Sequence, residues 1–329
     1  MELRKPAYYD DFQCIAAACP DSCCKEWEVD VDEPTAAHYR SLSGPLGDRL
    51  RQVLRDDNTM TITDRRCPMW RLDGLCEIQA QLGHDALCQT CRDFPRLRHD
   101  YGNFVEMGLE LSCPEAARLI FTSAKQNWIC ETIAGETAPE YEPEIMEILL
   151  SSRQTALDFL ETATYSLPKT LAVLLLFAHD VQAALDGGEI AVFDPDALLT
   201  EARSYVGASD ICNIFSFLSE LEILTPQWQE RLQAGAVNAH WHEDLRPLAR
   251  YGIQRYWLQA ISDYDLVCRV KFILIACIVV NAMGGNPVQT AQLFSKEIEN
   301  NWDNVDAILD GAYTSAAFTD TNLFGLLLL

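Results

Sequence analysis

A chain of 329 residues, of which 49% are apolar and 9% aromatic, can bury a substantial core and is too apolar to stay disordered. Its net charge of −24 repels phosphate groups, which argues against nucleic acid and anionic membrane surfaces as partners. Residues 1–130 carry 15 basic against 21 acidic side chains, whereas the other 199 residues carry 10 against 28. The second half therefore presents the acidic surface, which either serves solubility alone or receives a basic segment of another protein.

The N-terminal stretch and the two longest apolar runs bear on localisation. The start, "MELRKPAYYDDFQC", lacks the apolar core of a signal peptide. The runs at 171–177 and 272–280 are far shorter than the roughly 20 residues that span a bilayer. We expect both runs to form buried core helices in a cytoplasmic protein without membrane insertion.

Residues 26–64 carry short strand-like and helical patterns. The stretches "EWEVDV" (26–31) and "TMTITD" (59–64) alternate as strands do, and we expect two short strands there. Between them, Asp32 or a neighbour precedes Glu33 and Pro34, a pattern typical of a helix start. The Cys-rich region is therefore predicted to mix short strands with helices.

Nine of the thirteen cysteines fall within residues 1–113. A disulfide framework fits poorly, because the number is odd, the compartment is expected to be reducing, and adjacent Cys23 and Cys24 could not bridge without strain. Nine clustered structural thiols would also be improbable, so we predict that the region binds a metal ion or an iron–sulfur cluster. The four later cysteines are scattered, and two of them, Cys212 and Cys277, lie among aliphatic residues and are predicted to be core residues. The candidate ligands are Cys14, Cys19, Cys23, Cys24, Cys67, Cys76, Cys88, Cys91 and Cys113.

The spacing of these cysteines favours an iron–sulfur cluster over zinc, with zinc as the alternative. Residues 88–91, "CQTC", form one pair of ligands, but no second CxxC matches it. Irregularly spaced, all-thiolate donors suit an iron–sulfur cluster better. Cys88 and Cys91 are the first ligands to expect, and Cys14 and Cys113 are the last. Which residues complete the set of four is left open, with partners expected from Cys19, Cys23, Cys24, Cys67 and Cys76.

The stretch after this pair, "CRDFPRLRHD", is locally basic in an acidic protein. It contains Arg92, Arg96 and Arg98. These side chains either form a solvated turn or face a negative cluster or an anionic group of a cofactor.

A helix is predicted after Ser112 or Cys113. Pro114 fits its first position, and Glu115 is favourable near the positive end of the helix dipole. Cys113 is then either a ligand held at a helix start or a capping residue that happens to be cysteine.

The remainder of the chain is predicted to be helical. Residues 131–144 are rich in Pro, Glu and Thr and are expected to be a linker between a Cys-rich cluster-binding domain (1–130) and an α-helical domain (145–329). Helical periodicity predicts a bundle of seven to nine helices. The fold class is therefore mainly α, with a few short strands in the first domain. The clearest helical patterns cover 144–163, 168–185, 196–205, 212–224 and 286–302.

The order of these motifs resembles the flagellin lysine N-methylase family, FliB. The similar stretches, over about residues 7–121, are "AYYDDFQC", "CPDSCCKEWEVDVDEPTAAHY", "DGLCEIQAQLGHDALCQTCRDFPRL" and "ELSCPEAARL". Cys-box proteins described as zinc- or iron-chelating are more distantly similar. The resemblance implies methyl transfer from S-adenosylmethionine to lysine side chains of flagellin. It also implies a [4Fe–4S] cluster held by the N-terminal cysteines.

The residues alone reveal no S-adenosylmethionine site. No Gly-rich turn follows a strand pattern, and the CxxxCxxC run of radical enzymes is missing, because Cys24 follows Cys23 at once. The amine of the lysine that is to be methylated must be neutral and shielded from water. Candidates for removing the proton of this lysine are Glu106, Glu110 and Tyr101. A solvated helix or strand face explains these residues better, and we assign no base. The cluster could either coordinate the methyl donor or be purely structural.

Two functions from different classes follow. The first is an S-adenosylmethionine-dependent protein-lysine N-methyltransferase whose acidic helical domain receives a flagellin segment. The second is a non-enzymatic zinc- or iron–sulfur-binding redox or interaction protein, which the missing methyl-donor motif favours. The histidines of "VNAHWHEDLRP" (237–247) invite a further metal site, but a polar loop ahead of a helix is the better interpretation.

Overall fold

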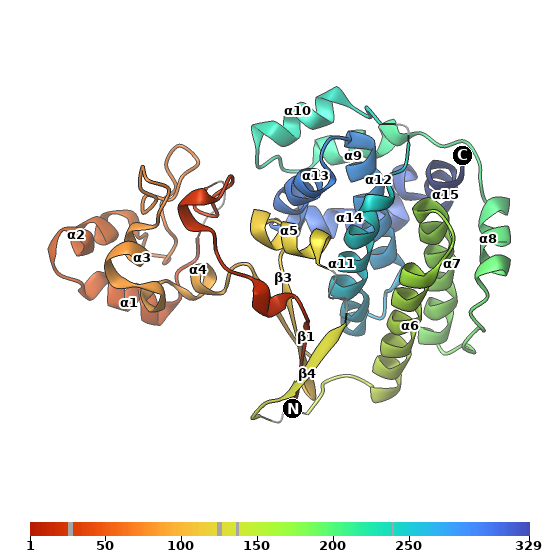
Figure 1. Ribbon diagram of the computed structural model, residues 1–329, viewed down its shortest axis with the longest axis horizontal. Coiled ribbons are helices and arrows are strands. Elements are labelled where there is room, and N and C mark those ends of the chain that lie inside the picture. The colour runs from red at the N-terminus through yellow and green to blue at the C-terminus, as the bar shows by residue number, and fades with distance from the viewer. Residues whose placement is uncertain (26–28, 124–126, 136–137, 239) are drawn as a thin grey trace.

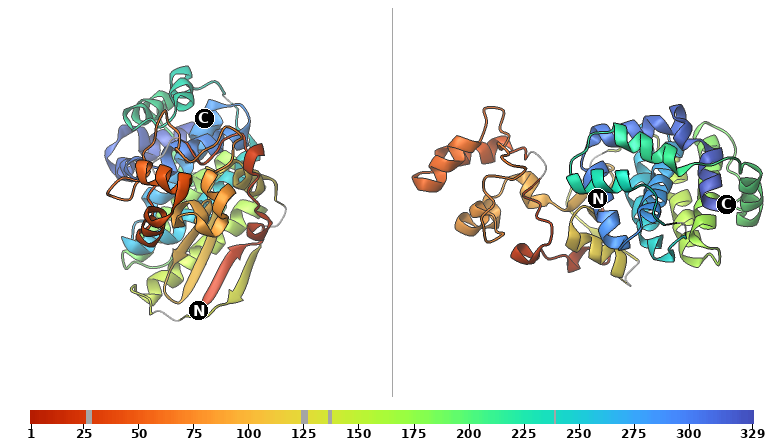
Figure 2. Two further views of the ribbon diagram at one scale, coloured as in Figure 1. Left: turned by 90° about the vertical axis from the view of Figure 1, so that its left-hand side faces the viewer. Right: turned by 90° about the horizontal axis from the view of Figure 1, so that it is seen from above.

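The computed structural model describes residues 1–329 except 26–28, 124–126, 136–137 and 239. The chain is mainly α-helical and contains one four-stranded mixed sheet, so the predicted fold class is confirmed at that level. Figure 1 shows a small lobe built from α1 to α4, set apart from a larger helical body. Figure 2, seen from above, shows the same separation. The division into domains at 130 and 144 stays a prediction.

The small lobe (residues 29–93) has its own apolar core. Its first helix begins where predicted, because the Asp32 carboxylate accepts the backbone N–H of Thr35 at 3.1 Å and so caps α1. Tyr39 on α1 is fully buried at the centre of this core. The helices of the lobe are α1 (Glu33–Ser41), α2 (Gly44–Val53), α3 (Glu77–Leu82) and α4 (Gln89–Asp93).

The sheet joins residues that lie far apart in the sequence. Its order is β2-β3-β1-β4, and β1 pairs with β3 in parallel, with Glu2 opposite Phe104. The β1–β4 and β2–β3 pairs are antiparallel. The edge strand β4 extends into the segment predicted as a linker. The strands are β1 (Glu2–Pro6), β2 (Arg96–Asp100), β3 (Phe104–Leu109) and β4 (Trp128–Thr132).

The strands expected at 26–31 and 59–64 are not formed in the described residues. Asp30 and Thr59 make only an isolated bridge, as do Leu54 and Met60. Residues 26–28, including Trp27 of the motif, lie outside the described residues. Local alternation was therefore misleading here, because these stretches contact each other in the small lobe at single positions and extend no ladder.

The helical body surrounds one central, fully buried helix. Every residue of α12 (Val267–Met283) is buried, and α7 packs beside it, which confirms both predicted core helices. Among the described residues, none of the helices has the length and apolar character required to cross a membrane. The other helices of the body are α5 (Pro114–Thr122), α6 (Pro143–Thr162), α7 (Leu167–Leu185), α8 (Pro195–Ser204), α9 (Ile211–Glu220), α10 (Pro226–Ala234), α11 (Arg246–Tyr256), α13 (Pro287–Phe294), α14 (Trp302–Thr314) and α15 (Asp320–Leu328).

The described part of residues 143–329 thus contains ten α-helices, more than the seven to nine predicted. The pattern at 286–302 is one source of the difference, because it is not a single helix. It comprises α13, a π-helical turn at Ser295–Glu299 and the first residue of α14. Of the two later cysteines predicted to be core residues, Cys277 is buried as predicted, but Cys212 is exposed.

The π-helical turn carries a buried carboxyl group, Glu297. Its Oε2 accepts the backbone N–H of Leu224 at 2.8 Å, and burial raises the pKa of Glu297 to about 7. A carboxyl whose pKa is raised on folding stabilises the protein below its ordinary pKa of 4.5, and this stabilisation is lost as pH rises through 7. Glu297→Gln mimics the protonated form, so we expect it to raise the free energy of unfolding at pH 8 by up to about 3 kcal/mol.

Urea unfolding of both proteins at pH 5 and pH 8 measures this effect. The wild type should lose stability across this interval relative to the variant, which lacks the titrating group. An identical change with pH in the two proteins would contradict the assignment.

Candidate functional site

One cavity brings together the nine cysteines of the N-terminal region. Its volume is about 440 Å³, and its wall is formed by the small lobe, the N-terminal segment, the start of α5 and the π-helical turn after α13. In Figure 1 the N-terminal segment passes between the small lobe and the body. The sequence singled out this set correctly as a spatial group, while its role as a ligand set stays a prediction. The cysteines lining the cavity are Cys14, Cys19, Cys23, Cys24, Cys67, Cys76, Cys88, Cys91 and Cys113.

Three of these cysteines are the N-cap residues of helices. Cys76 precedes α3, Cys88 precedes α4 and Cys113 precedes α5. Burial raises the pKa values of Cys76 and Cys113, and the backbone N–H groups of the first turns partly offset this effect. A cysteine at such a position has its ionised form favoured by the N–H donors and the helix dipole. Cys113 is therefore both a capping residue and part of the cavity wall, so the two interpretations of it are compatible.

The cysteines come to the cavity from two apolar cores. Cys88 is buried in the core of the small lobe, and Cys67, Cys76 and Cys91 pack against the same core. Cys113 packs instead against the core of the helical body. The cavity therefore lies where two parts of the molecule with separate apolar cores meet, and its shape depends on how these parts are held together.

Cys14, Cys19, Cys23 and Cys24 belong to the segment between the sheet and the small lobe. A backbone hydrogen bond from the N–H of Cys67 to the carbonyl of Cys24, at 2.8 Å, fixes one end of this segment to the lobe. We call residues 19–24, "CPDSCC", the cysteine loop.

Burial opposes ionisation of most of these thiols. It raises the pKa of Cys67 to about 12 and that of Cys113 to about 11. In the part of the chain that the structure describes, none of the cysteines forms a disulfide. Most thiols of the cavity are therefore protonated when no cation is bound. A bound metal ion would offset the cost of burying the thiolate, because metal ligation requires the thiolate and releases the proton.

Two thiol pairs depart from this trend. The Cys91 thiol is hydrogen-bonded to Cys88, which lowers the pKa of Cys88. The Cys23 thiol likewise lowers the pKa of Cys24 to about 7. Each pair therefore offers one sulfur that ionises readily, as a first ligand must.

Three cations line the cavity. They are Lys25, Arg96 and Lys296. Only one arginine of the basic stretch contributes, since Arg92 and Arg98 are not in the lining. Lys296 was not anticipated, because it follows the last cavity cysteine by more than 180 residues and no local pattern marks it.

The thiols are distributed around the cavity and do not converge on one point. Among the described residues, no three His, Cys, Asp or Glu side chains are arranged to hold a single metal ion. A mononuclear zinc site needs four sulfurs about 2.3 Å from one atom. The small-lobe lining offers many thiol donors around a larger space.

The carboxylates considered for lysine binding lie elsewhere and have structural partners. Glu106 is on β3, not on a helix, and is 3% exposed. Both of its oxygens accept from the Arg153 guanidinium, at 2.6 and 2.7 Å. Burial raises the pKa values of Glu110 and Tyr101. The expectation of a solvated face is therefore wrong for Glu106, and none of the three lines the cysteine cavity.

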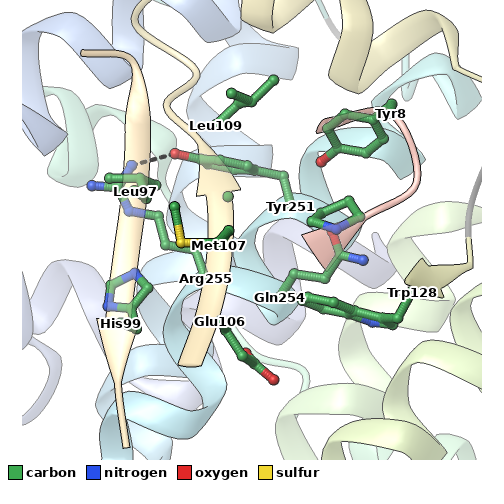
Figure 3. Close-up of a pocket in the computed structure, with 12 residues that line it drawn as sticks. Tyr8, Leu97, His99, Glu106, Met107, Leu109, Trp128, Tyr251, Gln254 and Arg255 are labelled. Carbon is green, nitrogen blue, oxygen red and sulfur yellow. Dashed lines mark hydrogen bonds between the residues drawn. The ribbon is translucent and has the colours of Figure 1, made fainter. Parts of the chain in front are cut away.

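A second, much smaller cavity lies between the sheet and α11 (Figure 3). Its volume is about 30 Å³, enough for about one water molecule. Figure 3 shows His99, Arg255 and Tyr251 around it, and the dashed line marks the hydrogen bond from Arg255 to the Tyr251 hydroxyl. The Nε atoms of Arg255 and His99 lack a hydrogen-bond partner among the described residues. A single buried water suits this space, which is too small for a cofactor.

The histidines at 240 and 242 lie in a polar turn. The N–H of His242 donates to Asn281 at 3.1 Å, and the Glu243 carboxylate accepts the backbone N–H of Leu167 at 2.8 Å. These contacts fasten the turn to α12 and α7. The loop interpretation of this stretch fits the described residues.

Comparison with known proteins adds sequence relatives but no structural ones. The chain is 31% identical over 229 residues to the lysine-N-methylases of Salmonella choleraesuis (strain SC-B67) and Salmonella typhimurium (strain LT2), an alignment covering 64% of this chain and 56% of each relative. It is 32% identical over 132 residues to the flagellar biosynthetic protein FliU of Salmonella muenchen, covering 36% of this chain and 76% of that protein. No protein-family model and no solved structure matches.

The chain belongs to the flagellin lysine N-methylase (FliB) family. It spans a little over half the length of the two lysine-N-methylases. The predicted membership of this family is thereby confirmed, whereas metal or cluster binding by the Cys-rich region stays a prediction.

Proposed function

We propose that the chain is a protein-lysine N-methyltransferase that transfers methyl groups from S-adenosylmethionine to flagellin lysines, with a [4Fe–4S] cluster bound in the cysteine cavity. One observation carries the proposal. All nine predicted cysteines line one cavity, in a chain whose relatives are named for lysine methylation and flagellar biosynthesis.

The arrangement of the donors supports a cluster over a single zinc ion. In a cluster each thiolate binds a different iron, so the ligands surround a body larger than one ion. The spread of thiols around about 440 Å³ matches that requirement better than it matches a mononuclear site. Backbone N–H groups at the helix starts would donate to the cluster thiolates and help set its potential.

The cysteines of the small lobe are the proposed ligands. Cys67, Cys76, Cys88 and Cys91 share one core and come from two short segments of the lobe. Cys24 lies beside them, because its carbonyl accepts the N–H of Cys67. We therefore expect the remaining cavity cysteines to border the cluster without all ligating it.

The same cavity is the proposed place for the methyl donor. A volume of about 440 Å³ falls within the range of about 300–1,000 Å³ common for small-molecule sites. Arg96 in the wall offers positive charge to the carboxylate of the donor. S-adenosylmethionine supplies an electrophilic methyl group, and this chain's part is to exclude water and to hold the lysine amine unprotonated.

The acidic second half of the chain supports a lysine-bearing partner. Residues 131–329 have a net charge of −18, which attracts basic segments and speeds their encounter. We propose that flagellin is bound there before its lysine reaches the cavity.

Mass spectrometry of flagellin tests the activity. Purified protein, reconstituted anaerobically with iron and sulfide and given S-adenosylmethionine, should add increments of about 14 Da to flagellin lysines. Cys212→Ser is the matched control, because Cys212 is exposed on α9 and lies outside the cavity. This variant should methylate at the wild-type rate.

Unchanged flagellin mass, with cluster and donor binding both verified, would overturn the enzyme proposal. The cavity would then support the non-enzymatic cluster-binding function that the sequence also allows.

A further inference from the structure

One carboxylate of the cysteine loop is held by the helical body. The Asp21 carboxylate accepts hydrogen bonds from Lys296 Nζ at 2.9 and 3.0 Å and from Gln292 Nε2 at 3.0 Å. Lys25, in the segment just after the loop, also pairs with it at 2.7 Å. Asp21 stands midway between Cys19 and Cys23, so these contacts act directly on the loop that presents both thiols.

Gln292 holds a second cysteine segment at the same time. Its Nε2 also donates to the carbonyl of Ser112 at 2.7 Å. Ser112 directly precedes Cys113, the cap of α5. One side chain of α13 therefore connects two of the segments that supply cavity cysteines.

The π-helical turn makes this contact possible and rigid. Lys296 and Glu299 lie on the same turn, Ser295–Glu299. Glu299 accepts from the hydroxyls of Tyr251 at 2.9 Å and Tyr256 at 2.6 Å, so the turn is fixed to α11. Lys296 is thus presented to the cavity by a braced segment.

The ion pair between Lys296 and Asp21 is largely buried. The Lys296 side chain is only 11% exposed and that of Asp21 22%. Solvent screens a pair at this depth less than it screens a surface pair, and the additional donor from Gln292 completes the coordination of the carboxylate.

We propose that Lys296 and Gln292 are positioning residues, which clamp the cysteine loop through Asp21 and the start of α5 through Ser112 so that the cysteines of both parts face one cavity. The clamp rests on the proposed function only for the identity of what the thiols bind. The helical body thereby holds two wall segments of a cavity whose other wall belongs to the small lobe.

Alkylation rates in the metal-free protein test the clamp. Mass spectrometry follows modification of Cys19 and Cys24 by iodoacetamide under native conditions with a chelator present. Lys296→Met should speed modification of both by about tenfold, as the charged hydrogen bonds to Asp21 are lost and the loop opens. Lys296→Arg should restore slow modification.

The direction of the change separates the clamp from a mere effect of charge. Removing a cation near a thiol disfavours the thiolate and slows alkylation. Lys25→Met is the matched control, because Lys25 pairs with the same carboxylate but belongs to the same segment of chain. It should not speed modification, and if Lys296→Met is no faster than Lys25→Met the proposal is overturned.

Folding is monitored in the same sample. Cys277, fully buried in α12, should stay unmodified, whereas exposed Cys212 should react at once in every variant. If Lys296→Met exposes Cys277, Gln292→Leu replaces it, because that change removes the neutral donor to Asp21 and Ser112 and leaves every charge near the thiols in place; it should again speed modification at Cys19 and Cys24, and wild-type rates there would overturn the clamp.

The labelling needs no iron, so it is independent of the proposed function. If Lys296→Met speeds alkylation but the wild type takes up no iron and sulfide, the cluster proposal is overturned and the clamp stands. If the wild type binds the cluster but Lys296→Met leaves the alkylation rates unchanged, the clamp is overturned and the cluster proposal stands.

Discussion

Replacing Cys88 by serine should abolish cluster assembly and methyl transfer together. Anaerobic reconstitution of the wild type should yield about four iron and four sulfide per chain, and Cys88→Ser should retain less than about one of each. The reason lies in the site: Cys88 is buried, caps α4 and has its pKa lowered by the hydrogen bond from Cys91. A serine hydroxyl does not ionise near neutral pH and is a poor iron ligand.

Iron and sulfide analysis, with the visible absorption of the cluster, checks this expectation. Cys14→Ser is the matched control, because Cys14 also lines the cavity but is exposed and belongs to neither apolar core. It should keep near-complete iron and sulfide. Full iron content in Cys88→Ser would show that the proposed ligand set is wrong.

A different result is informative about the metal. One tightly held zinc per chain without sulfide would make the cavity a structural site, and Cys88→Ser would then lower the free energy of unfolding. The methyl-transfer proposal would in that case rest on the sequence relatives alone.

The grouping of the nine cysteines could be predicted from the sequence because most of them lie in short segments with small spacings. Thiol-rich segments with short spacings favour a shared site, although ligation itself stays a prediction. The Pro114 and Glu115 pattern marks the helix start that positions Cys113. Asp32 as the cap of α1 was predicted for the same reason, since a cap depends on residues within one turn.

The missed features depend on contacts between distant residues. The parallel pairing of β1 with β3 joins Glu2 to Phe104, and no periodicity within either strand specifies its partner. Lys296 reaches Asp21 across 275 positions of sequence. The π-helical turn that presents Lys296 lies within an unbroken helical pattern, so the deviation from an α-helix could not be anticipated from that pattern.

Breaking the buried ion pair between β3 and α6 should cause a large loss of stability. Arg153 and Glu106 form two parallel hydrogen bonds, at 2.6 and 2.7 Å, and their side chains are 7% and 4% exposed. Arg153→Met leaves the Glu106 carboxylate buried, with Arg4 at 4.0 Å as its next cation. We expect a loss of about 3–5 kcal/mol in the free energy of unfolding.

Urea unfolding measures the loss, and a second bidentate pair supplies the control. Arg118 donates two hydrogen bonds to Glu115 at 2.6 and 2.8 Å, but its side chain is 54% exposed. Arg118→Met should cost less than about 1 kcal/mol, because water solvates the carboxylate that remains. The geometry of the two pairs is similar, so burial is the variable that differs.

The double variant Glu106→Gln/Arg153→Met separates the worth of the pair from the cost of one stranded charge. Without any buried charge to leave unpaired, it should be more stable than Arg153→Met alone, in spite of carrying one more substitution. If the double variant were the less stable of the two, the pair itself would be the source of the stability. If Arg153→Met cost no more than Arg118→Met, the sheet would not depend on this contact. In the expected case, the Glu106 carboxylate needs Arg153 chiefly because it is buried, and the pair ties the strand leading to Cys113 to a helix of the body.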